Sequence, residues 1–115
     1  MRKLTILFVL LIIAFVFQYC KSSKKAQAAK ANAVNYTTHI QPVVAATCTP
    51  CHFPPKGNKK PLDTYEDVRS NIDDILVRIQ KNPEEKGFMP FKHPKLPDST
   101  INLFVRFKTE GMTAK

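Results

Sequence analysis

The chain of 115 residues predicts an all-α fold, and three features of the sequence lead to that expectation. Apolar residues recur at helical spacing in three stretches. No stretch alternates apolar and polar residues with the period of two that a half-buried strand requires. Most of the nine prolines lie between Thr49 and Pro97, so the middle of the domain is expected to be rich in loops.

The first helical segment is expected from Thr38 to Thr47. Val43, Val44 and Thr47 lie three, four and seven residues after Ile40, so the four residues share one face of a helix. Pro42 fits this helix because it lies in the opening turn, where backbone N–H groups have no helical partner.

The second segment is expected from Tyr65 to Gln80. Thr64, followed three residues later by Asp67, predicts an N-cap with an acidic first turn. Ser70-Asn71 is a point at which the segment could divide into two short helices. The apolar residues that share one face are Val68, Ile72, Ile75, Leu76 and Ile79.

The third segment is expected from Ser99 to Thr109, with Asp98 as its cap and Gly111 ending it. Its apolar residues cover a broad arc, which predicts burial against two neighbours: Ile101, Leu103, Phe104, Val105 and Phe107. A domain of about 75–80 residues has a marginal core. These helices carry few large apolar side chains, so we expect a staple or a cofactor among them.

The N-terminal stretch is expected to lie outside this domain. Arg2 and Lys3 precede an apolar run from Leu4 to Phe17, which is the layout of an export signal. We therefore expect a signal peptide or membrane anchor over 1–20, a flexible tether over 21–34 and the folded domain over 35–113.

Three fates remain open for the chain after the apolar run. Cleavage before Cys20 would attach lipid to that cysteine, and "FQYC" resembles the lipobox of bacterial lipoproteins, with Tyr19 in place of a small residue. An uncleaved anchor would send Lys21, Lys24 and Lys25 across the membrane, against the positive-inside preference. Ordinary secretion would use the Ala-x-Ala sites at 26–28 or 31–33. We favour lipidation, which leaves the domain tied to the periplasmic side of a bacterial membrane.

The charge of the folded part is small once the N-terminal segments are set aside. The whole chain carries +9, but from Ala31 onward twelve basic residues face nine acidic ones, a net charge of +3. Nucleic-acid-binding proteins present a dense basic stripe, so no nucleic-acid partner is expected.

The motif "CTPCH" at residues 48–52 has the spacing C-x-x-C-H, the signature of covalent haem attachment. Cys48 and Cys51 are separated so that both thiols can reach the vinyl groups of one porphyrin. His52 then follows directly and can supply an axial nitrogen ligand to the iron. One covalent haem c is thus the expected cofactor.

Cys48, Cys51 and His52 have three alternative roles besides haem attachment. A structural zinc ion needs about four ligands. Cys48, Cys51 and His52 would give three, with Cys51 and His52 cramped as neighbours, and His39 or His93 would have to complete the site. A thioredoxin-like redox pair expects a βαβ setting, which this sequence does not predict. A structural Cys48–Cys51 disulfide is the last alternative.

The sixth ligand of a haem iron is expected from Met89, in the loop "GFMPFKHP". A thioether in a proline-flanked loop is a natural distal ligand, and Met/His ligation raises the potential into the range of electron carriers. His93 in the same loop is the rival ligand, and loop packing is the other use of Met89.

The chain from about Tyr36 to Gly111 resembles the small monohaem c-type cytochromes of the bacterial periplasm. The resemblance is carried by "IQPVVAATCTPCH", "LDTYEDVRSNI" and "GFMPFKHPKLPDSTINLFVRFKTEG". It implies thioether links at Cys48 and Cys51 and axial ligation by His52 and Met89. It also implies a backbone carbonyl partner for the proximal imidazole near Pro54 or Pro55. Phe104 and Phe107 stand where many members of the family carry a tryptophan.

The function implied by this resemblance is one-electron transfer between membrane-bound or periplasmic redox proteins, not enzymatic catalysis. Lys56, Lys59 and Lys60 could form a basic rim that steers acidic partners, and an ordinary solvated loop is the alternative for these three residues. A haem sensor or haem enzyme with a labile sixth ligand is the first alternative. A zinc-binding structural module is the second.

Overall fold

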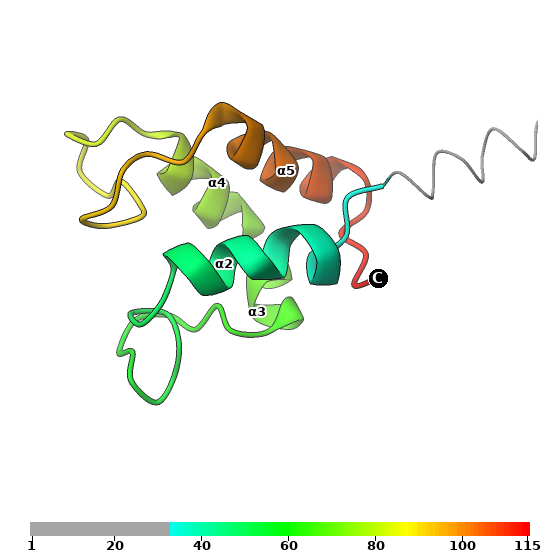
Figure 1. Ribbon diagram of the computed structural model, residues 1–115, viewed down its shortest axis with the longest axis horizontal. Helices are drawn as coiled ribbons and strands as arrows, with labels where there is room; N and C mark the ends of the chain where they lie inside the picture. Colours follow the sequence, from blue (N-terminus) through cyan, green and yellow to red (C-terminus); the bar gives the residue numbers. More distant parts are fainter. Residues whose placement is uncertain (1–32) are drawn as a thin grey trace, which may run out of the picture. The chain divides into compact units, whose positions relative to one another are not determined.

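The computed structural model describes residues 33–115. These residues form a compact unit from Val34 to Lys115. Its elements in chain order are a π-helical turn and four α-helices: η1 (Tyr36–Ile40), α2 (Gln41–Thr47), α3 (Tyr65–Ser70), α4 (Ile72–Gln80) and α5 (Asp98–Thr109). Figure 1 shows α2 and α5 running across the unit, with α3 and α4 joined end to end. Over this part of the chain, the all-α prediction is confirmed.

The first helix begins two residues before the predicted start. The side chain of Asn35 accepts a hydrogen bond of 2.9 Å from the N–H of Thr38, and this cap allows the helix to start at Tyr36. The turn η1 continues directly into α2. Ile40 of η1 and Val44 of α2 are buried, and Val43 of α2 is half-buried. The apolar face predicted for this segment therefore packs against the core.

The second segment divides at the predicted place. Thr64 caps α3 by accepting a hydrogen bond of 3.2 Å from the N–H of Asp67. The helix stops at Asn71, whose side-chain amide donates to the carbonyl of Asp67 at 2.7 Å. An asparagine side chain that bonds a nearby carbonyl competes with the helical ladder, which explains the division between α3 and α4.

The ends of α5 agree only in part with prediction. Asp98 was expected to cap this helix, and that expectation is wrong because the helix begins at Asp98 and follows Pro97, with no side-chain cap. The carbonyl of Pro97 accepts from Thr100 and Ile101, so the backbone closes the first turn. At the other end Gly111 adopts φ 100°, and the N–H of Met112 donates to the carbonyl of Phe107 at 2.9 Å. This pattern is a glycine-dependent helix stop, as predicted.

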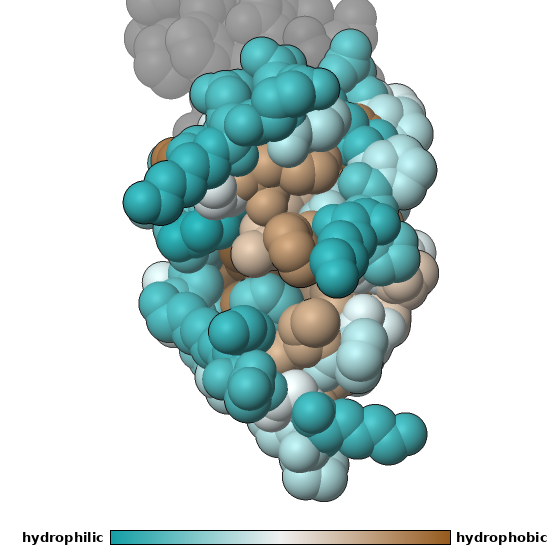
Figure 2. All heavy atoms as spheres, turned by 90° about the vertical axis from the view of Figure 1, so that its left-hand side faces the viewer, coloured by the Kyte–Doolittle hydropathy of each residue, from teal (hydrophilic) through white to brown (hydrophobic). Residues whose placement is uncertain are grey.

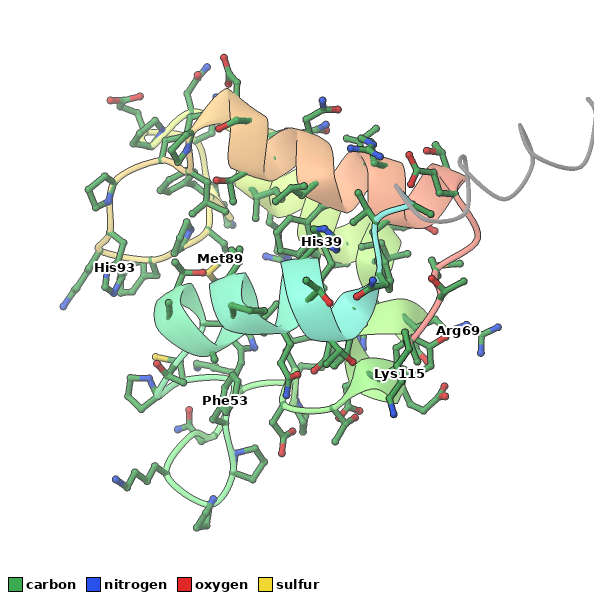
Figure 3. All side chains as sticks on the ribbon, turned by 45° about the vertical axis from the view of Figure 1, so that its right-hand side comes forward. His39, Phe53, Arg69, Met89, His93 and Lys115 are labelled. Atoms are coloured by element: carbon green, nitrogen blue, oxygen red, sulfur yellow. The ribbon has the colours of Figure 1, made fainter. Side chains whose placement is uncertain are left out.

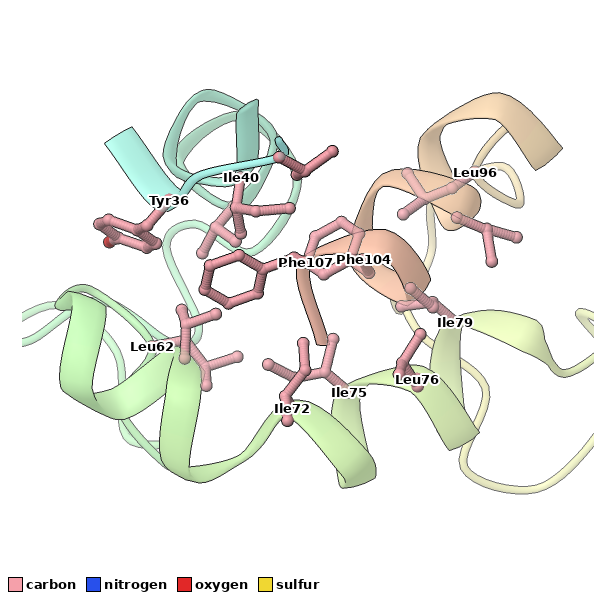
Figure 4. Close-up of a cluster of buried hydrophobic side chains, with 14 residues drawn as sticks. Tyr36, Ile40, Leu62, Ile72, Ile75, Leu76, Ile79, Leu96, Phe104 and Phe107 are labelled. Carbon is pink, nitrogen blue, oxygen red and sulfur yellow. The ribbon is translucent and has the colours of Figure 1, made fainter. Parts of the chain in front are cut away.

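The hydrophobic core consists of 14 buried residues contributed by all five elements and by the connecting segments (Figure 4). Phe104 and Phe107 are at most 2 % exposed, and Figure 4 shows their rings in the middle of the cluster. The core thus joins residues of every helix of the described part with residues of the connecting segments.

The two ends of the described chain lie together. Asn35 and Thr113 form an isolated bridge, and the N–H of Tyr36 donates to the carbonyl of Thr113 at 2.9 Å. The N–H of Val34 donates to Glu110 Oε2 at 2.6 Å. Figure 1 shows this terminal clasp at one end of the unit, while the loop after α2 and the loop between α4 and α5 lie at the other. We call the second end the loop end.

The predicted signal or anchor over 1–20, its candidate lipidation residue Cys20 and nearly all of the tether lie outside the described residues. Within residues 33–115, no helix has the length and apolar composition that crossing a membrane requires.

Candidate functional site

The C-x-x-C-H motif continues directly from the end of α2. The N–H of Cys48 donates to the carbonyl of Val44 at 2.9 Å, which makes this cysteine the C-cap of the helix. The N–H of His52 then donates to the carbonyl of Cys48 at 3.0 Å, so the motif forms one more turn of chain. The helix thus places the residues of the motif at the loop end of the unit.

The two cysteines occupy different environments. Cys48 is half-buried and packs against the hydrophobic core, whereas Cys51 is exposed. Burial raises the pKa of the Cys48 thiol, and the Thr47 hydroxyl, 3.7 Å from its sulfur, offsets part of that rise. Both sulfurs are free thiols, so the disulfide alternative is not realised in this structure.

The imidazole of His52 is held through one nitrogen. Its Nδ1 lies 2.6 Å from the carbonyl oxygen of Lys60. A carbonyl oxygen can only accept, so Nδ1 carries the proton and donates it. In the neutral ring Nε2 then keeps its lone pair, which is the arrangement that metal-binding histidines use.

The identity of this carbonyl corrects one expectation. The resemblance placed the partner of the imidazole near Pro54 or Pro55, and the structure places it at Lys60 instead. The loop must turn back before a carbonyl can face the ring, and that turn is complete only after Gly57. Pro61 favours extended backbone at the preceding Lys60, which helps to present its carbonyl.

The turn after the motif is closed by Gly57. Its N–H donates to the carbonyl of Phe53 at 2.9 Å, and a Cβ placed on Gly57 would come within 2.2 Å of the Cys51 carbonyl oxygen. Two further hydrogen bonds hold the returning chain: Lys59 N–H to the Cys51 carbonyl at 3.1 Å, and Leu62 N–H to the His52 carbonyl at 2.9 Å. We call residues 53–62 the motif loop. Residue 57 must be glycine, because only a residue without a Cβ can lie this close to the Cys51 carbonyl.

Met89 approaches the loop end from a second segment. It is half-buried on the connection between α4 and α5, and its N–H donates to the carbonyl of Arg78 at 3.3 Å. Figure 3 shows Met89 on the side of this connection nearest to α2, and His93 on its outer side. His93 is exposed to solvent. Of the two candidate sixth ligands, Met89 is therefore the one that lies on the α2 side of the connection.

The loop end is apolar at its middle and hydrophilic at its rim. Figure 2 faces this end and shows apolar side chains gathered between hydrophilic ones. The motif loop supplies three exposed lysines to this end, Lys56, Lys59 and Lys60, and no acidic residue. Phe91, next to the Met89-Pro90 pair, is 65 % exposed.

A zinc site of the predicted kind is not formed by the described residues. Among residues 33–115, no three His, Cys, Asp or Glu side chains come together as a metal ion would require. His39, one of the residues that would complete such a site, accepts a hydrogen bond on Nδ1 from the N–H of Asn35 near the terminal clasp.

Comparison of the chain with protein families, with curated proteins and with solved structures finds no match.

Two features of this site went unnoticed in the sequence. Gly57 is one of only three glycines in the sequence and lies six residues after Cys51. That position could have indicated a tight turn after the motif. Pro61 predicts extended backbone at Lys60. Only the folded loop shows that the carbonyl of Lys60 faces His52.

Proposed function

We propose that this chain is a one-electron carrier that binds a single covalent haem c at the loop end. The observation that carries the proposal is the hydrogen bond from His52 Nδ1 to the Lys60 carbonyl at 2.6 Å. It leaves Nε2 of a C-x-x-C-H histidine available as an axial ligand. The apolar middle of the loop end supports the same proposal, because a porphyrin needs apolar surface on which to pack.

Four side chains would hold the group. Cys48 and Cys51 would carry the thioether links, His52 would bind the iron through Nε2, and Met89 would bind it through its sulfur. Haem c, when bound, supplies an iron that gains and loses one electron. The protein supplies two neutral ligands on separately anchored loops.

The partners are proposed to be other redox proteins, membrane-bound or periplasmic, that present acidic surfaces. The exposed lysines of the motif loop support this class of partner, since complementary charge accelerates encounter. Attachment to a bacterial membrane on its periplasmic side, through lipid on Cys20 or through an uncleaved helix, is part of the same proposal. It rests on the N-terminal sequence.

The test is an optical spectrum of the full-length chain expressed together with a haem-attachment system. Spectra would be recorded in the oxidised and the reduced form, before and after extraction with acidified acetone. We expect haem that resists extraction, together with a weak sulfur-to-iron charge-transfer band at the red end of the oxidised spectrum. Chain without covalent haem would refute the proposal.

Two variants assign the sixth ligand. Met89→Ala should abolish the charge-transfer band, and the matched variant His93→Ala should leave it unchanged. Haem that resists extraction but lacks the band in the unmodified chain would favour the alternative of a sensor or enzyme with a labile sixth site.

A further inference from the structure

Two side chains close the start of the first helix. The side chain of Asn35 accepts from the N–H of Thr38 at 2.9 Å, as an N-cap does. In the opposite direction, Nδ1 of His39 accepts from the backbone N–H of Asn35 at 3.2 Å. A capping box joins a helix start in the same way, with a Glu or Gln side chain that reaches back to the N–H of the cap residue. His39 takes the place of that Glu or Gln here.

This role requires a neutral imidazole. A backbone N–H can only donate, so Nδ1 of His39 must offer its lone pair while Nε2 carries the proton. A protonated ring has hydrogen on both nitrogens and can no longer accept. Protonation of His39 would therefore break its bond to Asn35 and leave two N–H groups facing each other.

The other two histidines do not have this dependence. All three histidines lie in the described part of the chain. His52 donates through Nδ1 to the carbonyl of Lys60 at 2.6 Å, and a protonated ring can donate there as well. His93 is exposed on the outer side of its connection. Among residues 33–115, His39 is thus the histidine whose hydrogen bond is lost on protonation.

The bond that protonation would break lies inside the terminal clasp. On one side of Asn35, the N–H of Val34 donates to Glu110 Oε2 at 2.6 Å. On the other side, the N–H of Tyr36 donates to the carbonyl of Thr113 at 2.9 Å. Asn35 is half-buried between these two contacts, and a half-buried donor without an acceptor is unfavourable. A shift of Asn35 toward solvent would pull on both neighbouring bonds.

Charged groups near the clasp do not replace the lost acceptor. The helix α2 carries no charged residue, whereas η1 also packs against α5, and Figure 3 shows His39 on the side of η1 toward that helix. Glu110 would favour a protonated His39, but its two oxygens already accept from Arg106 Nε and from the N–H of Val34. The titratable and charged side chains brought near the clasp are Arg106, Glu110, Asp63, Asp67 and Lys115.

We propose that His39 makes the terminal clasp sensitive to pH. While its imidazole is neutral it accepts from Asn35 and the clasp is closed; when the imidazole is protonated the clasp loosens. The stability contributed by this bond is present above the range in which histidine side chains titrate, about pH 5–8, and is lost as the pH falls through that range. Loosening would lengthen the chain that leads from the N-terminal segment into the folded unit. The inference stands apart from the proposed function, because haem takes no part in it.

The test is amide hydrogen exchange, measured by NMR on the full-length chain in detergent at about pH 7.5 and about pH 5.5. Rates are divided by the intrinsic exchange rates at each pH, so that only the opening of the structure remains. The reporters are the N–H groups of Tyr36 and Thr37, which donate to the carbonyls of Thr113 and Ala114. Both pH values lie above 4.5, so the carboxylate of Glu110 stays ionised throughout.

The matched variants are His39→Gln and His93→Gln. Glutamine at residue 39 keeps an acceptor oxygen that does not titrate. We expect the protection of the reporters to fall roughly tenfold between the two pH values in the unmodified chain and in His93→Gln, and to change little in His39→Gln. The fall should follow the titration of the His39 ring, which the NMR signals of its carbon-bound protons report.

A third variant, His39→Ala, removes the acceptor at every pH. It should therefore show low protection of the reporters at both pH values. Protection that does not depend on pH in the unmodified chain would overturn the inference. An equal fall in His39→Gln would do so as well, because it would assign the pH dependence to another group.

Discussion

His52 is oriented by a residue eight positions later: its Nδ1–H donates to the carbonyl oxygen of Lys60 at 2.6 Å. This contact requires the motif loop to fold back on the C-x-x-C-H motif. The side chain of Lys60 takes no part in it, so the backbone path of the loop determines the orientation of the ring.

Gly57→Ala should disturb this orientation. A Cβ at residue 57 would approach the carbonyl oxygens of Cys51 and Pro50 within 2.2 Å and 2.3 Å, so the backbone must move. We expect a loss of about 3 kcal/mol in the free energy of unfolding, measured by urea denaturation, together with a shift in the reduction potential of the haem-loaded chain.

Gly111→Ala is the matched control for this prediction. Gly111 has φ 100° and no atom within 4 Å of its Cβ position, so alanine there introduces backbone strain without a clash. It should lower stability and leave the reduction potential unchanged. A potential that shifts equally in both variants would mean that Gly57 has no particular role at His52.

Phe107→Ala tests the packing of the hydrophobic core. Phe107 is 0 % exposed in that core, so its truncation should cost about 3–5 kcal/mol. The matched variant Phe91→Ala removes a ring that is 65 % exposed and lies 5.4 Å from Lys92 Nζ, and it should cost less than about 1 kcal/mol. Similar costs in urea denaturation would contradict the packing described above.

Charge reversal in the motif loop should alter electron transfer with charged reagents. In haem-loaded chain, Lys56→Glu with Lys59→Glu should slow oxidation by an anionic iron complex roughly tenfold at low salt and speed oxidation by a cationic cobalt complex. Both effects should shrink as salt is added. Lys115→Glu, which Figure 3 places away from the loop end, should have a much smaller effect. Stopped-flow rates that do not depend on the sign of the reagent's charge would rule out a steering role for these lysines.

Much of the helical framework could be predicted from sequence, because the determinants are local. Thr64, Asn71 and Gly111 act through hydrogen bonds or backbone angles within a few residues, and each ends or begins a helix as expected. Asn35 was a visible cap that the prediction missed. At Asp98, propensity suggested a cap, but Pro97 already held the extended backbone that a cap requires.

The candidate residues of the site could be named from the sequence, but the contacts that hold them in place could not. The spacing of Cys48, Cys51 and His52 can be read directly from the sequence. The partner of His52 is not, because it depends on how closely Gly57 approaches the Cys51 carbonyl. The contact of Arg78 with the Met89 connection likewise arises from two elements that meet only in the folded chain.

Stability of the terminal clasp should depend on pH through Glu110. Hydrogen bonds from Arg106 and from the Val34 N–H hold the pKa of Glu110 below its ordinary value of 4.5. A carboxylate whose pKa is lowered by folding contributes stability above pH 4.5, and that contribution is lost as the pH falls through the folded value.

Glu110→Gln should therefore be less stable than the unmodified chain at neutral pH, and the difference should vanish in acid. Thermal denaturation between pH 7 and pH 2 would measure it. A difference that stays constant over this range would show that the carboxylate charge does not stabilise the clasp.

The pairing of Asn35 with Thr113 has a practical consequence for experiments on this chain. Both termini of the described unit leave it from the side remote from His52 and Met89 (Figure 1). A linker, a reporter protein or a gold surface joined to the C-terminus would hold the unit with its loop end facing outward. Electrodes prepared in this way would present every molecule in one orientation, so that the proposed exchange of electrons could be tested without blocking the loop end.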